Sequence, residues 1–171
     1  MSTPYERLEP KLAKHAVAFT IAKLVYPGLD IEYPIAICWR ESRGNHLAVS
    51  PDGGFGLMQL TKGFHDSWLA AIASDGVPLW QKPVDNFLEG VRLFLKNLDI
   101  AINTGFAYDD AVVVAIAGYN ASLSRVIGHG HDLTGNSLLL AVDSITTQEP
   151  IPYVQDVLAT AANFRALMEA A

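Results

Sequence analysis

One acidic side chain, Glu41, follows an apolar run and lies between two arginines in the segment ICWRESRGNH, residues 37–46. On a helical wheel of residues 34–43, at about 100° per residue, Glu41 falls beside the apolar stripe. Arg40 and Arg43 project toward the other side of the same wheel. The spacing therefore predicts a carboxyl group that is partly withdrawn from water and is not neutralised by these arginines. Withdrawal from water raises the pKa of a carboxyl group, which suits a general acid that must hold its proton near neutral pH.

Plainer interpretations apply to the same segment. A glutamate near a helix end usually lies at the surface in a weak ion pair, and the wheel alone does not decide between that role and catalysis. Cys38 is the only cysteine of the chain, so no intramolecular disulfide forms and the fold does not depend on an oxidising compartment. We expect Cys38 to be a small buried side chain rather than a nucleophile.

The elements that must position Glu41 are mostly helices. Apolar residues recur at helical spacing through most of the chain, with proline and glycine residues between the periodic segments. The predicted helices are residues 10–25, 34–43, 64–74, 84–103, 111–117, 137–145 and 152–168. The run AVVVAIA at residues 111–117 is apolar on every side, so a buried strand also fits it, but its helical surroundings favour a helix. The stretch SPDGGFG predicts a minor hairpin or an extended loop around residues 48–60, and residues 128–135 are expected to form another loop.

Composition indicates one globular domain spanning residues 1–171, of the all-α or α-dominated class. The 171 residues are 50% apolar and 18% charged, which is ample material for one packed core. The net charge of −6, without a long run of either sign, differs from the basic stripe of a nucleic-acid-binding protein. No window approaches the ~18 apolar residues of a membrane span, and the N-terminal residues lack the apolar core of a signal peptide.

Five blocks of sequence follow one another at domain-like spacing between about residue 34 and residue 157. They are Glu41-Ser42, AVSP with GFGLMQ at residues 48–51 and 54–59, Asp85-Asn86-Phe87 with Gly90, AGYNA at residues 117–121, and Glu149 with Tyr153-Val154. Any one block is weakly specific, but five in this order make a specific pattern. The pattern resembles the lytic transglycosylase (SLT) family, glycoside hydrolase family 23, which shares the lysozyme-like superfamily with goose-type lysozyme.

The resemblance implies a lysozyme-like fold and cleavage of the β-1,4 bond between N-acetylmuramic acid and N-acetylglucosamine in peptidoglycan, without a cofactor. Most glycosidases use two carboxyl groups, but no second acid lies in a block that resembles a catalytic motif, and Asp52 belongs to a turn. Similarity to lytic transglycosylases implies that one acid suffices. Glu41 would protonate the leaving oxygen and then take a proton from the muramic acid O6 hydroxyl, which closes a 1,6-anhydro ring.

The resemblance also implies a set of substrate-binding residues: Ser42, Ser50, Met58, Gln59, Tyr119, Asn120, Glu149 and Tyr153. The serines and Gln59 could equally make turn, cap and backbone hydrogen bonds, while Met58 and the tyrosines could fill the core. Thr61-Lys62-Gly63 and Ser122 depart from the family pattern. The resemblance places both departures at the rim of the substrate-binding groove. They therefore bear on substrate preference more than on activity.

No metal site is expected. His129, His131 and Asp132 are close in sequence, and two histidines with one aspartate can bind zinc. No further ligand is spaced convincingly, and the chemistry that the resemblance implies needs no metal.

The expected partner is the glycan strand of peptidoglycan, with no nucleic acid and no membrane span, and we expect a monomer. The missing signal core favours synthesis in a host cytoplasm, with release to the bacterial cell wall by a holin or carriage on a virion, as for a phage lysis enzyme. Two alternatives stay open. A goose-type lysozyme-like muramidase would hydrolyse the same bond with water, and a non-catalytic peptidoglycan-binding or assembly module could use the same fold.

Overall fold

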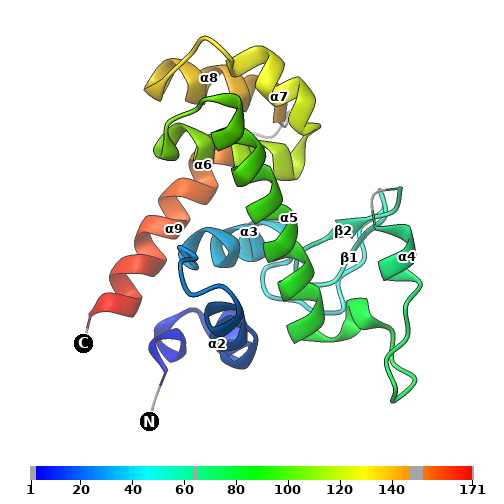
Figure 1. Cartoon of the computed structure of the whole chain (residues 1–171). Coiled ribbons are helices and arrows are strands. Elements are labelled where there is room, and N and C mark those ends of the chain that lie inside the picture. The colour runs from blue at the N-terminus through cyan, green and yellow to red at the C-terminus, as the bar shows by residue number, and fades with distance from the viewer. Residues whose placement is uncertain (1–2, 64, 147–151, 171) are drawn as a thin grey trace. The chain divides into compact units, whose positions relative to one another are not determined.

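The computed structural model describes residues 3–63, 65–146 and 152–170, and most of them are helical (Figure 1). The elements in chain order are η1 (Pro4–Arg7), α1 (Pro10–Ala13), α2 (Ala16–Val25), α3 (Glu32–Ser42), β1 (Gly54–Phe55), β2 (Leu60–Thr61), α4 (Asp66–Leu69), η2 (Leu79–Gln81), α5 (Pro83–Thr104), α6 (Tyr108–Asn120), α7 (Leu123–Gly130), α8 (Gly135–Thr146) and α9 (Tyr153–Glu169). This content confirms the predicted α-dominated fold class. Within the described stretches, no helix combines the length and the apolar character needed to cross a bilayer.

The chain forms two compact units, each with its own packing. The first comprises Met1–Val91 and Ala161–Ala171, and the second comprises Arg92–Thr160. The long helices α5 and α9 each contribute a part to both units. The single domain expected over residues 1–171 stays a prediction.

Aromatic packing between α2 and the start of α5 forms part of the core of the first unit. Phe19 and Phe87 are fully buried, and their rings meet edge to face with centroids 4.8 Å apart. Tyr5 of η1 packs against Phe19 in the same manner at 5.6 Å. Each such pair adds about 0.5–1.5 kcal/mol beyond the burial of its apolar area, so the N-terminal segment is joined firmly to α5.

A small hairpin follows α3, as the turn-rich stretch predicts. β1 pairs antiparallel with β2, with Gly54 opposite Thr61 and Phe55 opposite Leu60. Gly56, between the strands, has a φ of 76°, and a Cβ there would come within 2.6 Å of a neighbouring backbone oxygen. Glycine is the residue that meets both conditions, so this turn requires it.

Helix α6 is the buried centre of the second unit and packs against α7 and α8 (Figure 1). Six of its residues are buried, namely Ala111, Val112, Val114, Ala115, Ile116 and Ala117. The apolar run at residues 111–117 is therefore a buried helix, as its surroundings predict. On α8, the Oδ1 atom of Asp143 accepts a hydrogen bond from the Val154 amide at 2.8 Å, which satisfies one donor in the first turn of α9.

The helix predicted over residues 10–25 is wrong in its continuity. α1 ends at Ala13 and α2 begins at Ala16, because His15 adopts non-helical backbone angles between them. The His15 side chain is buried, and its Nε2 atom donates a hydrogen bond to the Gly44 carbonyl oxygen at 2.9 Å. A tertiary contact thus overrides the local helical preference.

Two further boundaries differ from the sequence predictions. Of the helix predicted over residues 64–74, only α4 is helical in the described part, since the chain then turns and Ile72 pairs with Pro78 in an isolated antiparallel bridge. The loop predicted over residues 128–135 is partly helical, because α7 continues to Gly130. A Cβ at Gly130 would lie 2.5 Å from a leucine of α8, so the end of α7 packs closely against α8.

Replacement of Gly90 by alanine should destabilise the fold. Alanine gains about 1 kcal/mol of helix propensity over glycine, but a Cβ on Gly90 would lie 2.5–2.7 Å from three side-chain atoms of the buried Met58. Overpacking of this kind costs about 1–3 kcal/mol, so we expect a net loss of about 1 kcal/mol in the free energy of unfolding, measured in urea. Gly28→Ala is the control, because no atom lies within 4 Å of its Cβ position. A Gly90→Ala variant as stable as the parent would contradict the contact.

Candidate functional site

Helix α3 holds Glu41 in its last turn. Residues 35–38 are fully buried, so the helix is fixed in the core of the first unit. It ends where Arg43 and Gly44 adopt left-handed angles, with φ of 51° and 72°. Glu41 itself is half-buried. The acid is therefore partly withdrawn from water, as the helical wheel predicts.

The cation that follows Glu41 most closely is directed elsewhere. The guanidinium group of Arg43 lies over the ring of Trp39, 5.1 Å from its centroid. Trp39 precedes Glu41 by two residues and so projects from about the opposite side of the helix. The charge of Arg43 is thus turned toward Trp39, in agreement with the wheel.

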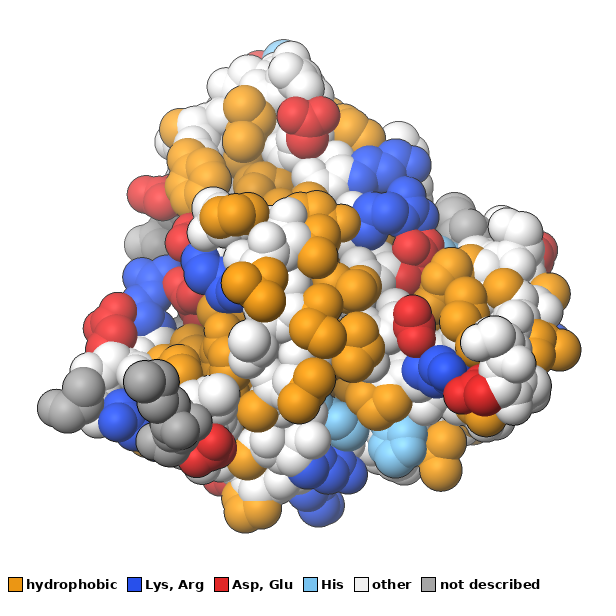
Figure 2. Space-filling view, turned by 60° about the horizontal axis from the view of Figure 1, so that its bottom comes forward, with side chains coloured by type: hydrophobic (Ala, Val, Ile, Leu, Met, Phe, Trp, Pro, Cys, Tyr) orange, Lys and Arg blue, Asp and Glu red, His pale blue; other side chains and the backbone are white. Residues whose placement is uncertain are grey.

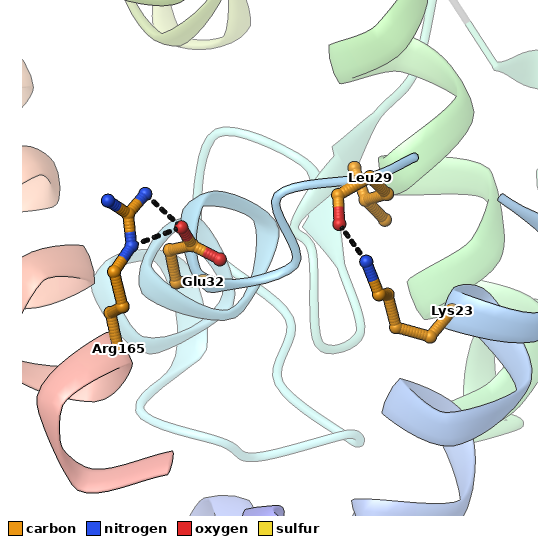
Figure 3. A network of polar contacts seen from close by, with 4 residues as sticks. All are labelled: Lys23, Leu29, Glu32 and Arg165. Atoms are coloured by element: carbon orange, nitrogen blue, oxygen red, sulfur yellow. Dashed lines mark hydrogen bonds and ion pairs between the residues drawn. The ribbon is translucent and has the colours of Figure 1, made fainter. Parts of the chain in front are cut away.

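An ion pair fixes the other end of α3 (Figure 3). Glu32 lies in the first turn and is 6% exposed, and its Oε1 atom accepts hydrogen bonds from Arg165 of α9, through Nε at 2.7 Å and through Nη2. A carboxylate at this end of a helix also interacts favourably with the helix dipole. Lys23 donates to the carbonyl oxygens of Leu29 at 2.7 Å and Pro27 at 2.9 Å. The segment that leads into α3 is therefore held by side-chain contacts.

Ser50 and Gln59, two of the predicted substrate-binding residues, meet around Gly54. The Ser50 hydroxyl accepts a hydrogen bond from the Gly54 amide at 2.8 Å. A Cβ on Gly54 would lie 2.9 Å from Ser50 Oγ and 2.7 Å from Gln59 Oε1. The Gln59 Nε2 atom donates to the carbonyl oxygens of Gly56 at 2.8 Å and Ala48 at 3.2 Å. Turn and backbone bonding is thus present for both residues, and their contact with a sugar stays a prediction.

Met58 and Ser42 make the structural contacts that were the alternatives to substrate binding, namely core packing for Met58 and a helix-end hydrogen bond for Ser42. Met58 is fully buried beside Gly90, which favours core filling. Ser42 is half-buried, and its hydroxyl donates to the Cys38 carbonyl oxygen at 3.2 Å, which satisfies an acceptor near the end of α3. Substrate binding by either residue stays a prediction.

The remaining candidates come from the second unit. Tyr119 is half-buried and Asn120 is exposed, at the last two positions of α6. Tyr153, the first residue of α9, is 2% exposed, which leaves little of its surface for a sugar. Glu149 lies outside the described residues. Roles in binding stay predictions for all four.

Two contacts that brace the hairpin were not predicted from the sequence. Asn86 is fully buried, accepts a hydrogen bond from the Met58 amide at 2.8 Å and donates to the Phe55 carbonyl oxygen at 3.1 Å. His65 and Glu89 are also buried, with Nδ1 and Oε1 3.1 Å apart. The family-like block at residues 85–90 points to α5 as important here. Nothing in the sequence joins His65 to Glu89, because the fold brings them together.

The histidines that raised the question of zinc have local partners. His131 lies 3.1 Å from Asp132, and His129 Nδ1 donates to the Arg125 carbonyl oxygen at 3.0 Å. Over residues 3–63, 65–146 and 152–170, no three His, Cys, Asp or Glu side chains gather in a way that could hold a metal ion.

Cys38, one helical turn before Glu41, should be inert in the native protein. Burial raises the pKa of its thiol to about 12, so the thiolate is scarce at mildly alkaline pH. We expect a thiol-specific disulfide reagent to label Cys38 only in denaturant, followed by absorbance of the released chromophore. Rapid labelling of protein with a native circular dichroism spectrum would contradict the burial.

Loss of the Asn86 side chain should loosen the hairpin. Asn86→Ala leaves the buried Met58 amide without its partner, at a cost of about 1–3 kcal/mol, and the part-buried Phe55 carbonyl without its donor, at a smaller cost. We therefore expect the free energy of unfolding to fall by about 2–4 kcal/mol in a denaturant titration. Asn103→Ala, at an exposed position of the same helix, should change it by less than about 0.5 kcal/mol. Equal losses of stability in the two variants would contradict the role of the Asn86 hydrogen bonds in holding the hairpin.

Comparison with known families identifies the chain. The family model of the Transglycosylase SLT domain matches residues 20–131, which is more than half of the chain. The match includes Glu41, Gln59 and Tyr119 and ends before Tyr153. A comparison with curated proteins gives no match. Members of the matched family are lytic transglycosylases that act on peptidoglycan. The chain belongs to the transglycosylase SLT domain family.

Proposed function

We propose that this protein is a peptidoglycan lytic transglycosylase in which Glu41 is the only acid and base. The observation that carries the proposal is the family match over Glu41, combined with the half-buried position of this acid at the end of a buried helix. A half-buried carboxyl group suits the role of a general acid, because it is partly shielded from water and still accessible to a substrate.

The proposed reaction uses the same carboxyl group twice. Glu41 donates its proton to the glycosidic oxygen as the bond from that oxygen to C1 of N-acetylmuramic acid breaks. The acetamido group of the same sugar stabilises the positive charge that develops at C1. The Glu41 carboxylate then removes the proton from the O6 hydroxyl, and O6 bonds to C1. The product is a 1,6-anhydro sugar, Glu41 regains its proton, and no water is consumed.

Asp52 is the nearest acid in sequence to the proposed binding loop, and it does not suit the role of a second proton donor. It is exposed, and a hydrogen bond from the Ser50 hydroxyl lowers its pKa below the ordinary value. Asp52 therefore carries its charge at neutral pH. An ionised carboxylate has no proton to donate, so Asp52 does not compete with Glu41 as the general acid.

Substrate contacts are proposed for two matched residues of the first unit, Ser50 and Gln59, which would bind the sugar or its acetamido groups. For Tyr119 and Asn120, in the second unit, binding is proposed from the family resemblance alone. Met58 and Tyr153 would act mainly through packing, as their burial suggests. The role in phage lysis or in a virion stays a prediction from the sequence.

Glu41→Gln should abolish most of the activity, because glutamine keeps the shape of the side chain but carries no acidic proton. General acid–base catalysis contributes about 10²–10⁴-fold, so we expect a loss of this size in the release of soluble fragments from purified peptidoglycan. Thermal unfolding of the variant should match that of the parent. Asp52→Asn should keep its activity within a few-fold.

The product decides between the proposed reaction and hydrolysis. Mass spectrometry of the digest should show muramic acid ends lighter by one water than reducing ends, without oxygen from labelled water. Incorporation of that oxygen would assign a goose-type hydrolase instead. A Glu41→Gln variant that still digests peptidoglycan would overturn the catalytic assignment.

A further inference from the structure

A basic pocket lies at the end of α3, in the first unit, and no step of the proposed reaction uses it. Its lining residues are Lys11, Lys14, Ser42, Arg43, Gly44 and Asn45, and its volume is about 380 Å³. We refer to it as the basic pocket. Three of its six lining residues are cations and none is acidic, in a chain whose net charge is −6.

The two lysines of the basic pocket are exposed cations in a chain of negative net charge. On the face drawn in Figure 2, acidic and basic side chains are mixed with apolar ones, and no broad area has one sign. Lys11 and Lys14 are exposed, and neither has an ion-pair partner among the residues that the structure describes. Cations that converge on a cavity attract anions more strongly than scattered ones do.

The backbone around the basic pocket is fixed before anything binds. A Cβ on Gly44 would lie 2.4 Å from the Lys11 carbonyl oxygen, so α1 and the end of α3 are in close contact. The buried His15 ring donates to the Gly44 carbonyl oxygen at 2.9 Å, and burial lowers the pKa of His15. His15 is therefore neutral at neutral pH, and the cationic residues that line the pocket are the two lysines and Arg43, whose guanidinium group lies over Trp39.

We propose that the basic pocket binds a carboxylate of the peptide stem of peptidoglycan. This inference rests on the proposed function. If Glu41 protonates the bond at C1 of N-acetylmuramic acid, the lactyl group on O3 of that sugar, which carries the peptide stem, leaves the glycan near the end of α3. Ser42 follows Glu41 directly and lines the pocket. An extended stem spans about 3.3 Å per residue, so a stem of a few residues is longer than one helical turn of about 5.4 Å.

The test uses soluble peptidoglycan fragments with intact peptide stems. Phosphate-containing wall polymers are removed first, because they would supply a second kind of anion. One portion keeps its free carboxyl groups, and in the other these groups are converted to amides, which leaves the glycan unchanged. The full chain with Glu41→Gln binds both fragments without rapid cleavage. We expect it to bind the free-carboxyl fragment roughly tenfold more tightly, since two or three exposed charge pairs contribute together. This preference should shrink at about 1 M salt, where the Debye length is about 3 Å.

Adding Lys11→Gln and Lys14→Gln should reduce the preference to less than about twofold and leave the affinity for the amide fragment unchanged. The control adds Lys96→Gln and Arg125→Gln, which remove two exposed cations outside the pocket and should keep the preference. Arg43→Gly is a further variant, because glycine suits the left-handed backbone at this position. It should weaken binding of the free-carboxyl fragment without loss of stability.

Three results would overturn the basic pocket as a carboxylate site. They are equal affinity of the parent for both fragments, a preference that survives the lysine substitutions, and equal loss of both affinities in the lysine variant. Failure of the proposed function has a different signature. In that case Glu41→Gln still digests peptidoglycan, or the product lacks the anhydro ring, whatever the fragment preference is.

Discussion

The position of Glu41 depends on the fixation of one buried helix, α3, at both of its ends. At the start, Glu32 is almost fully buried and is paired with Arg165. Because the Arg165 side chain is 48% exposed, the pair adds little net stability. The pair instead fixes the geometry. Separation of Glu32 from Arg165 would leave a buried carboxylate without its cation, which is costly, so the start of α3 stays beside Arg165. At the end, the left-handed turn at Arg43 and Gly44 stops the helix directly after the acid.

Helix α5 connects two of the family-like blocks, the one at residues 85–90 and the one at residues 54–59. Asn86, Glu89 and Gly90 follow one another at the spacing that places residues on one helix face. Each contacts the hairpin segment or the chain just after it: the amide side chain binds backbone atoms, the carboxylate meets His65, and the glycine accommodates Met58. The motif on α5 therefore describes a surface shaped to hold the loop that carries Gln59. Its residues need not touch a substrate to be required.

The sequence predicted the features that depend only on residue type and helical spacing. The amphipathic stripe of α5, the apolar run in α6 and the half-buried position of Glu41 follow from residue type and helical spacing. The interruption at His15 does not, because a single tertiary hydrogen bond to Gly44 decides it. The pairing of His65 with Glu89 was likewise invisible, as the two residues lie 24 positions apart and neither belongs to a recognisable ligand spacing.

Two other acids of the first unit, Asp52 and Glu89, differ from Glu41 in their surroundings. Asp52 is exposed, and a hydrogen bond from the Ser50 hydroxyl lowers its pKa below the ordinary value. Glu89 is buried, but it is engaged with His65 and serves to join α5 to the segment after the hairpin. Glu41, by contrast, is half-buried, and the cation that follows it, Arg43, lies over the ring of Trp39. The proposed mechanism, in which the substrate supplies both the stabilising acetamido group and the attacking hydroxyl, asks the protein for one proton donor, and Glu41 is the acid proposed for that role.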